Sequence, residues 1–427
     1  MTAITFRNAR IVDPASGHDA LGCLRVVDGQ IDDIGDGIEQ DHDRVIEANG
    51  AILCPALIDL RAAIEPVFTP SGETLDTLAP SAAAGGIGTV VIAPTDTMPI
   101  DTPEAVAGLK SAALPNPVRI LIAGGATQSL AGEHLAEIGL MAESGAVFVA
   151  QGDRPITDTT ALRNLFNYAA GFELWIAVPA RDPFLSSGTV ATESEAAARN
   201  GLVTEPAAAE RLAIDRLATL AELTGARLMI DRVSTAEGLD ALARARQRGI
   251  EICATAAVSN LALNAVDADG LDPAYRLMPP LRSEADRRAL VAAVASGQID
   301  AVVSDHRPMS PDEKAQPFSE ATPGSTGIEI LLPALLRLVH EEELNLVDAL
   351  RPLTAGPADL LGLSQGRLEA GAPADLVLID GDAPWVYDAA AGRSARHNST
   401  WQNRRFQGQV LMTIVNGGIV RNLREWS

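Results

Sequence analysis

Short, largely apolar segments alternate with longer helical stretches through the middle of this chain. Eight such segments lie at residues 57–60, 89–93, 119–123, 146–150, 174–178, 227–230, 251–253 and 301–304. Ala-rich stretches with a helical repeat separate them, for example at 206–225 and 236–249. Short apolar strands between helices are typical of a parallel sheet that helices cover. The pattern therefore predicts an α/β fold, most simply a (β/α)8 TIM barrel.

The two ends of the chain follow the alternating pattern of exposed β-strands instead. Residues 23–27 and 30–31 flank Asp28-Gly29, which predicts a hairpin with a type I′ turn. Residues 374–379 and 410–415 predict two more strands near the other end. We expect both ends to pair in a small β-sandwich domain. The predicted boundaries are 1–54 and 366–427 for the sandwich and 55–365 for the barrel.

Composition narrows the classes of function. The 427 residues carry a formal net charge of −23, which disfavours binding to nucleic acid or to anionic membranes. The three cysteines are far apart in the sequence, so neither a disulfide framework nor a zinc–thiolate site is expected. No stretch resembles a signal peptide or reaches the ~18 apolar residues of a membrane span. We expect a cytoplasmic protein.

Several blocks of sequence resemble the dihydroorotase family of the amidohydrolase superfamily. They occur in the family's order and cover nearly all of the chain, at residues 55–60, 72–78, 84–90, 206–216, 233–237, 279–282, 304–306, 323–329 and 371–377. The resemblance implies a barrel hydrolase that opens a cyclic amide in pyrimidine biosynthesis. It also implies one or two metal ions at the barrel mouth, where the bound metal generates hydroxide at neutral pH.

The ligands that this resemblance implies are largely missing. The family places a His-x-His pair after the first strand, a bridging carboxylate or carboxylated lysine after the fourth, one histidine after each of the fifth and sixth, and an aspartate after the eighth. The corresponding residues here are Arg61, Ala63, Ala150 or the adjacent Gln151, Pro179, Arg232 and Asp305. Only Asp305 matches, so we assign it as a vestigial catalytic residue. Asp153 lies near the fourth-strand position but is offset.

The residue inventory leaves no substitutes for the lost ligands. Of the six histidines only His306 lies near a predicted barrel mouth, and neither Lys110 nor Lys314 follows the fourth strand. We therefore expect no metal cofactor.

Expected substrate contacts are missing as well. The segment 64–67, Ile-Glu-Pro-Val, lacks the family's arginine and glycine. Asp96 and Met278 stand where the family commonly has asparagine. A carboxylate in place of an amide would repel an anionic substrate.

Three interpretations remain open. The first is a non-catalytic dihydroorotase homologue, or pseudoenzyme, which the resemblance associates with aspartate carbamoyltransferase and with a homo-oligomer. The second is an active amidohydrolase with a degenerate, metal-free site around Asp305 and Asp153, or with zinc if a metal is present after all. The third is a ligand-binding sensor at the barrel mouth.

The two arginines at lost ligand positions have a predicted role of their own. An emptied polar cavity would leave the Asp305 carboxylate buried alone, which is costly. We expect Arg61 and Arg232 to fill the space and neutralise Asp305.

Overall fold

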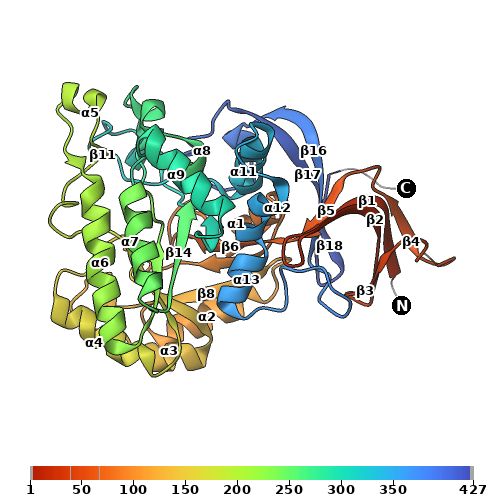
Figure 1. Ribbon diagram of the computed structural model, residues 1–427, viewed down its shortest axis with the longest axis horizontal. Helices are drawn as coiled ribbons and strands as arrows, with labels where there is room; N and C mark the ends of the chain where they lie inside the picture. Colours follow the sequence, from red (N-terminus) through yellow and green to blue (C-terminus); the bar gives the residue numbers. More distant parts are fainter. Residues whose placement is uncertain (1–2, 39, 67, 424–427) are drawn as a thin grey trace.

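The computed structural model describes residues 3–38, 40–66 and 68–423. Val67, the last residue of the 64–67 segment discussed above, lies outside this part, as do residues 1–2, 39 and 424–427. A barrel and a β-sheet domain lie side by side, and both chain ends belong to the β-sheet domain (Figure 1).

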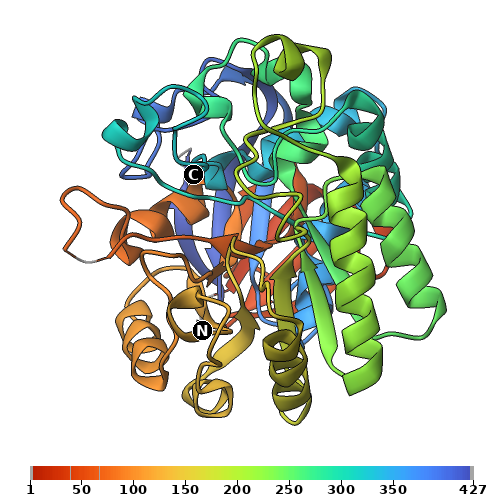
Figure 2. The ribbon, with the colours of Figure 1, turned by 90° about the vertical axis from the view of Figure 1, so that its left-hand side faces the viewer.

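Eight parallel strands form the barrel sheet, in the order β15-β14-β13-β10-β9-β8-β7-β6. They are β6 (Leu57–Ala62), β7 (Ile87–Ile92), β8 (Arg119–Gly125), β9 (Ala146–Ala150), β10 (Trp175–Pro179), β13 (Arg227–Asp231), β14 (Ile252–Ala257) and β15 (Ala301–Val303). These are the eight strands predicted from the sequence, so the (β/α)8 prediction is confirmed. Figure 2 shows helices outside these strands.

Helices cover the barrel sheet on its outer side. The longer ones are α1 (Leu75–Ala84), α2 (Pro103–Ala113), α3 (Ile138–Ser144), α4 (Thr159–Ala170), α6 (Ala207–Thr224), α7 (Ala236–Gln247), α9 (Glu284–Ala295) and α11 (Leu331–His340). Shorter ones are α5 (Glu195–Arg199), α8 (Val258–Ala262), α10 (Pro311–Lys314), α12 (Leu346–Leu350) and α13 (Ala355–Leu361). Single 3-10 turns are η1 (Gln128–Leu130), η2 (Ala265–Ala268), η3 (Pro273–Tyr275), η4 (Ile328–Ile330), η5 (Arg351–Leu353) and η6 (Ala389–Ala391). A small excursion after β10 contains β11 (Ala191–Thr192) and β12 (Thr204–Glu205).

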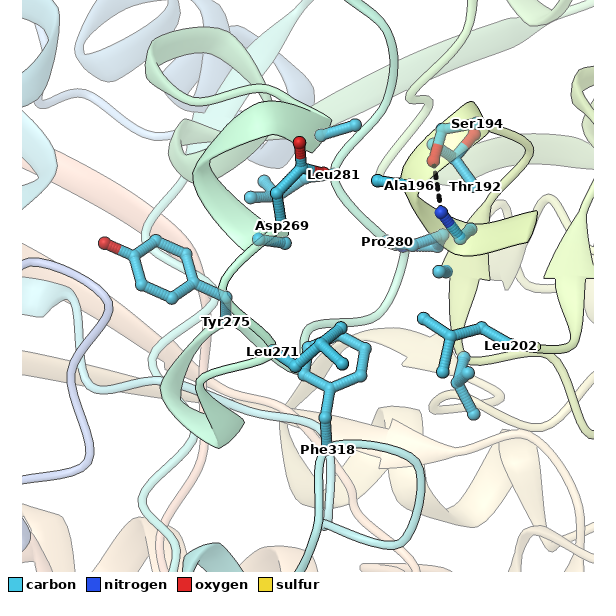
Figure 3. A pocket seen from close by; sticks show the side chains of 15 residues that line it. Thr192, Ser194, Ala196, Leu202, Asp269, Leu271, Tyr275, Pro280, Leu281 and Phe318 are labelled. Carbon is cyan, nitrogen blue, oxygen red and sulfur yellow. Dashed lines mark hydrogen bonds between the residues drawn. The ribbon is translucent and has the colours of Figure 1, made fainter. Parts of the chain in front are cut away.

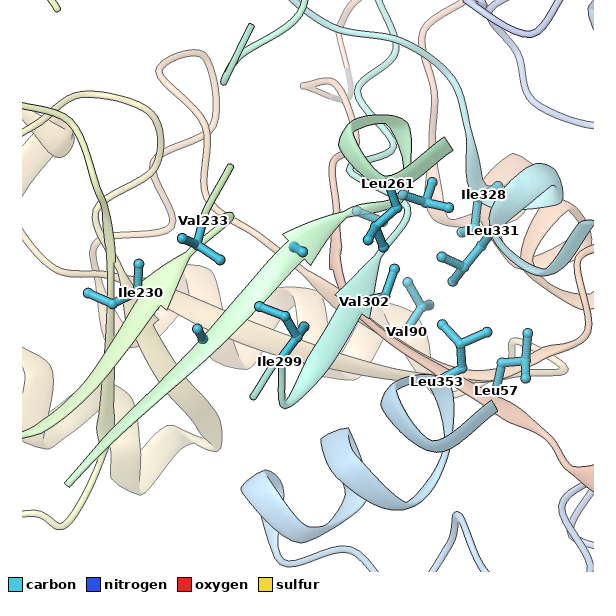
Figure 4. Packing of buried hydrophobic residues seen from close by; sticks show 14 of the residues in the cluster. Leu57, Val90, Ile230, Val233, Leu261, Ile299, Val302, Ile328, Leu331 and Leu353 are labelled. Carbon is cyan, nitrogen blue, oxygen red and sulfur yellow. The ribbon is translucent and has the colours of Figure 1, made fainter. Parts of the chain in front are cut away.

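Local sequence explains where the predicted helices begin and end. Thr235 caps α7, since its Oγ1 accepts a hydrogen bond from the backbone N–H of Gly238 at 3.0 Å. Gly225 ends α6 with a left-handed backbone (φ 70°), which glycine adopts without steric cost. Between strands and helices the core is aliphatic, and Figure 4 shows side chains such as Val90, Val302 and Leu331 packed in it.

The terminal strands form a second sheet, in the order β18-β17-β16-β5-β1-β2-β3, with β4 paired to β1. They are β1 (Ala3–Asp13), β2 (His18–Val27), β3 (Gln30–Gly35), β4 (Arg44–Glu47), β5 (Ile52–Pro55), β16 (Leu376–Val386), β17 (Arg405–Val415) and β18 (Gly418–Asn422). Antiparallel pairing of β5 with β16 joins the two chain ends, as expected. Residues of both ends share one hydrophobic core. The domain boundaries stay predictions, although β5 and β6 do belong to different sheets.

The predicted hairpin is confirmed in its detail. Val27 pairs with Gln30, and Asp28 and Gly29 both have positive φ, 48° and 86°. Two positive φ values in a two-residue loop define the type I′ turn that Asp-Gly favours.

A partly buried ion pair joins the two domains. Arg119 on β8 donates to the carboxylate of Asp375 at 2.5 Å, and a second nitrogen of Arg119 donates to the side chain of Asn416 at 3.0 Å. Asp375 is 3% exposed. The ion pair therefore fixes the β-sheet domain against one end of the barrel.

Asp59 connects the first and last barrel strands. Its Oδ1 accepts the backbone N–H groups of Arg61 and Ser304, each at 3.2 Å, and its Oδ2 accepts the Ser304 hydroxyl. Beyond β6, the N–H of Ala63 donates to the carbonyl of His306 at 2.8 Å. A buried side chain thus supplies part of the seam between β6 and the three-residue strand β15.

No helix in the described residues is both long enough and apolar enough to span a membrane.

The seam makes stability depend on pH. Burial raises the pKa of Asp59 from 3.8 to about 6, although hydrogen bonds from Ser304 and Arg61 act against the rise. Between these two pKa values the folded protein keeps a proton that the unfolded chain has released. The Asp59 contribution to stability therefore falls as pH rises from about 4 to about 6, by on the order of 3 kcal/mol.

Asp59→Asn should remove this term, because an amide stays neutral, its oxygen can keep both backbone hydrogen bonds and its NH2 can donate to Ser304. The free energy of unfolding of the variant minus that of the unsubstituted chain should rise between pH 4 and pH 6 and then level off, as measured by urea denaturation. Asp36→Asn, at an exposed turn position, is the control with the same change in charge. A difference that does not vary with pH would refute the assignment.

Candidate functional site

Arg61 is the centre of the barrel mouth. Each of its three guanidinium nitrogens donates to a different carboxylate: Nε to Asp305, Nη1 to Asp231 and Nη2 to Asp153, all at 2.8 Å. These aspartates follow or end three different strands, β15, β13 and β9. Arg61 lies in β6 and is only 8% exposed. One planar cation therefore ties together side chains from four strands around the barrel.

Arg232 repeats part of this pattern from the end of β13. Its Nη1 donates to both oxygens of Asp305, at 2.9 and 3.0 Å, and to the carbonyl of Met278 at 2.8 Å. Its Nη2 contacts Asp153. Burial alone would lower the pKa of Arg232, but Asp231 and Asp305 outweigh it and raise that pKa. The prediction that Arg61 and Arg232 neutralise Asp305 is therefore confirmed.

Two residues of the cluster have an unusual backbone. Arg232 has φ 61° and Asp305 has φ 48°, both in the left-handed region that non-glycine residues rarely adopt. Such conformations cost about 1 kcal/mol or more each and persist where surrounding contacts impose them. At Arg232 the backbone N–H donates to Thr255 Oγ1 at 2.9 Å, which helps to hold the turn.

Asp231 and Arg307 complete the cluster, and neither was predicted from the sequence. Asp231 is the last residue of β13, and Arg307 contacts Asp153 from the loop after β15. Both occupy ends of barrel strands, where the fold gathers polar side chains. Their position at or just after the ends of barrel strands was the sequence signal that could have identified them. The resemblance drew attention only to the family's ligand positions.

The completed cluster has no net charge. It contains three arginines and three aspartates, namely Arg61, Arg232, Arg307, Asp153, Asp231 and Asp305. Every carboxylate accepts hydrogen bonds from at least one guanidinium group. A divalent cation placed here would add two charges to a neutral cluster and would have to displace an arginine.

The residues therefore do not fit the metal centre that the family resemblance implies. The lost positions hold cations or small apolar residues, and the remaining carboxylates are occupied by arginines. In the described residues no group of three or more His, Cys, Asp or Glu side chains is arranged to hold a metal ion.

The other positions singled out from the sequence lie close by but have structural contacts. Ala63, Ala150 and Pro179 are buried at the ends of their strands. Gln151 is buried too. Its side-chain oxygen accepts a hydrogen bond from the Thr127 hydroxyl and its NH2 group donates to the carbonyl of Leu130, each at 2.9 Å. None of them brings a metal-binding atom to the cluster.

His306 points away from Asp305. Its Nδ1 accepts the backbone N–H of Gly327 at 3.3 Å, and its Nε2 lies 3.6 Å from Glu73. Burial would raise the pKa of Glu73, but His306 and Ser394 lower it overall. The structure pairs His306 with Glu73, so an Asp305–His306 acid–base pair is not formed.

A second arginine–carboxylate group lies beside the first. Arg181, after β10, donates to Glu205 at 2.9 and 2.7 Å, and Arg282 contacts the other Glu205 oxygen. Burial acts to raise the pKa of Glu205, but the charges of Arg282 and Arg181 lower it overall. Arg181 also approaches the sulfur of Met278 at 3.1 Å. The fifth strand thus ends in an ion pair where the family has a histidine.

Three of the hollows in the described residues lie near the mouth. One of about 350 Å³ is lined by Asp153, Arg154 and Arg181, and another of about 530 Å³ by Ala63 and Arg307. The exposed Asp96 lines both. The third lies between the α5 excursion and residues 265–281, where Figure 3 shows mainly apolar side chains. Its volume of about 30 Å³ admits a single water molecule.

Comparison with known proteins defines the class. Residues 70–420 match the amidohydrolase family. The dihydroorotase of Anaeromyxobacter dehalogenans (strain 2CP-1 / ATCC BAA-258) is 35% identical over 416 residues, 96% of each chain. The dihydroorotase of Syntrophotalea carbinolica is 34% identical over 424 residues, 99% of this chain and 100% of that one. This chain therefore belongs to the amidohydrolase family, and within it the chain is dihydroorotase-like.

Solved structures agree with this fold. The L-hydantoinase (dihydropyrimidinase) from Arthrobacter aurescens superposes with a TM-score of 0.88 at 25% identity, covering 100% of this chain and 98% of its own. A dihydropyrimidinase from Brevibacillus agri NCHU1002 gives 0.84 at 19% identity, covering 100% and 96%. The latter similarity concerns the fold alone.

Removing the central guanidinium should be costly. Arg61→Ala leaves Asp153, Asp231 and Asp305 close together with less compensating charge, so we expect a loss of about 3–5 kcal/mol in the free energy of unfolding. Arg61→Lys keeps the charge, but its donors sit on a single nitrogen that cannot take the positions of all three guanidinium nitrogens, so its loss should be intermediate. Arg154→Ala, an exposed arginine of the same mouth, should change stability by less than ~0.5 kcal/mol. Urea denaturation at neutral pH measures all three, and equal stability of Arg61→Ala and the unsubstituted chain would contradict the assignment.

Proposed function

We propose that this protein is a non-catalytic dihydroorotase homologue that acts as a structural partner of aspartate carbamoyltransferase in pyrimidine biosynthesis. The observation that carries the proposal is the Arg61 guanidinium, which donates one hydrogen bond to each of three carboxylates at the barrel mouth. In this proposal the arginine occupies the place of the catalytic metal. It holds the three carboxylates together but does not activate water.

The chemistry of the mouth supports the loss of hydrolysis. Opening a cyclic amide requires an activated water and a group that takes up its proton. Both oxygens of Asp305 already accept N–H donors from arginines, so a water molecule would have to compete with them for this carboxylate. The ring of the neighbouring His306 meets Glu73 and the backbone of Gly327 instead. The second interpretation, catalysis around Asp305 and Asp153, would therefore have to use carboxylates that arginines already occupy.

The larger hollow at the mouth also suits the substrate poorly. Dihydroorotate and its ring-opened product are anions. The hollow beside Ala63 is lined by Glu65, Asp96, Glu313 and one cation, Arg307, leaving a surplus of negative charge. Like charges facing a ligand weaken its binding, which also disfavours a sensor for these metabolites.

Support for a scaffolding role comes from what the chain keeps. Similarity to dihydroorotases extends over 96–99% of the chain, and the barrel core is closely packed. We expect such a scaffold to work in the cytoplasm as a homo-oligomer in complex with the transferase.

Activity and metal content test the first half of the proposal. The purified protein should turn over neither dihydroorotate nor carbamoyl aspartate above the uncatalysed rate, and elemental analysis should find well below one zinc per chain. Chelator should leave its melting temperature unchanged. Stoichiometric zinc, or a turnover that Asp305→Ala abolishes, would overturn the assignment.

Association tests the second half. The transferase from the same organism, coexpressed with this chain, should copurify with it and lose assembly and activity when the chain is omitted. An inactive chain with a transferase that assembles and works alone would reject the partnership and leave the pseudoenzyme assignment standing. A barrel-mouth variant such as Arg154→Ala, coexpressed and purified in the same way, serves as the control.

A further inference from the structure

A groove crosses the junction between the barrel and the β-sheet domain. It consists of two hollows of about 570 and 480 Å³, one on either side of the end of α11, and both are lined by Arg337 and Glu341. Figure 1 places α11 between α9 and the strands β16 and β17. We call this surface the α11 groove. Because the two hollows share residues, an extended segment could occupy both.

The half of the groove on the β-sheet domain contains an apolar patch. It is lined by Trp385, Val386 and Phe406 from the paired ends of β16 and β17. The indole N–H of Trp385 donates a hydrogen bond to the carbonyl of Gly408 at 2.9 Å. The indole therefore has no free N–H group to donate to a ligand. Val386 is 56% exposed. Phe406 is buried and Trp385 is half-buried, so Val386 is the exposed apolar side chain here. An exposed apolar side chain beside a hollow is a typical anchor point of protein interfaces.

Arginines outnumber carboxylates across the groove as a whole. The two hollows together are lined by five arginines, Arg287, Arg288, Arg337, Arg404 and Arg405, and by three carboxylates, Asp267, Glu284 and Glu341. Four of the arginines form ion pairs: Arg287 and Arg288 with Glu284, Arg337 with Glu341, and Arg404 with Asp267. Arg287 also pairs with Glu343 beside the groove. The positive surplus therefore rests on Arg405, and it contrasts with the net charge of −23 of the whole chain.

Arg405 is the most available of these cations. It is exposed, and in the described part of the chain no carboxylate lies within ion-pair distance of it. The register pairs it with Val386, so an unpaired cation and an exposed apolar side chain stand next to each other.

We propose that the α11 groove docks an acidic segment of another protein that carries one large apolar side chain. The apolar side chain contacts Trp385 and Val386, and a neighbouring carboxylate faces Arg405. Complementary charge of this kind fixes register and speeds association.

The amount of negative charge distinguishes the proposed occupant from two others. A nucleic acid or a second copy of this chain carries many more negative charges than a short acidic segment, so each would meet a stronger long-range repulsion from this acidic protein. The inference does not depend on the transferase proposal, because it concerns a different surface and is tested on this chain alone.

The test uses a fluorescein-labelled peptide with a central tryptophan flanked by glutamates, titrated with the full-length protein and followed by fluorescence anisotropy. Saturable binding is expected at low ionic strength. Arg405→Glu should weaken it by about tenfold, because an attraction becomes a repulsion. Val386→Asp should weaken it similarly. Arg163→Glu, an exposed arginine on α4, carries the same change of charge and should leave the affinity within about twofold.

Peptide controls separate charge from anchoring. Replacing the tryptophan by serine should weaken binding, and replacing the glutamates by lysines should abolish it. Equal affinity of Arg405→Glu and the unsubstituted chain, or no saturable binding, would overturn the proposal. Displacement of the peptide by a single-stranded oligonucleotide, or self-association of the protein that Arg405→Glu abolishes, would assign the groove to another occupant and equally overturn it.

Discussion

The barrel mouth depends on the directionality of one guanidinium group. A metal ion attracts ligands from all sides, whereas the Arg61 guanidinium presents its N–H groups in one plane at fixed angles. Three aspartates from three strands meet those directions at 2.8 Å each. Around them Arg232 and Arg307 bring the charge to zero, so this part of the barrel is stable only as a complete set.

Most of the fold could be predicted from the sequence because its signals are local. Each barrel strand is a short apolar segment, and the Asp28-Gly29 turn requires only two neighbouring residues. That the two chain ends pair with each other followed from a simple constraint, since strands at both ends need partners. The particular pair that joins them, β5 with β16, was not predicted. The Asp59 seam could not be predicted, because an aspartate within an apolar strand does not reveal which backbone groups it meets.

The site was predictable only in part. Arg61, Arg232 and Asp305 could be located because the resemblance fixes where ligands belong. Asp231, Arg307 and the Arg181–Glu205–Arg282 group depend on side-chain directions that no local pattern encodes. The left-handed backbone at Arg232 and Asp305 is one reason why these directions could not be predicted. It reorients the chain at residue types that rarely adopt a positive φ.

The cluster also constrains which substitutions the barrel accepts one at a time. Three carboxylates share one guanidinium, so replacing Arg61 by histidine would leave several buried charges uncompensated before any metal could bind. Building a metal centre here would require coordinated changes at several strand ends, because each single change would be destabilising on its own. The shared arginine thus makes the present form of the barrel easier to keep than to change.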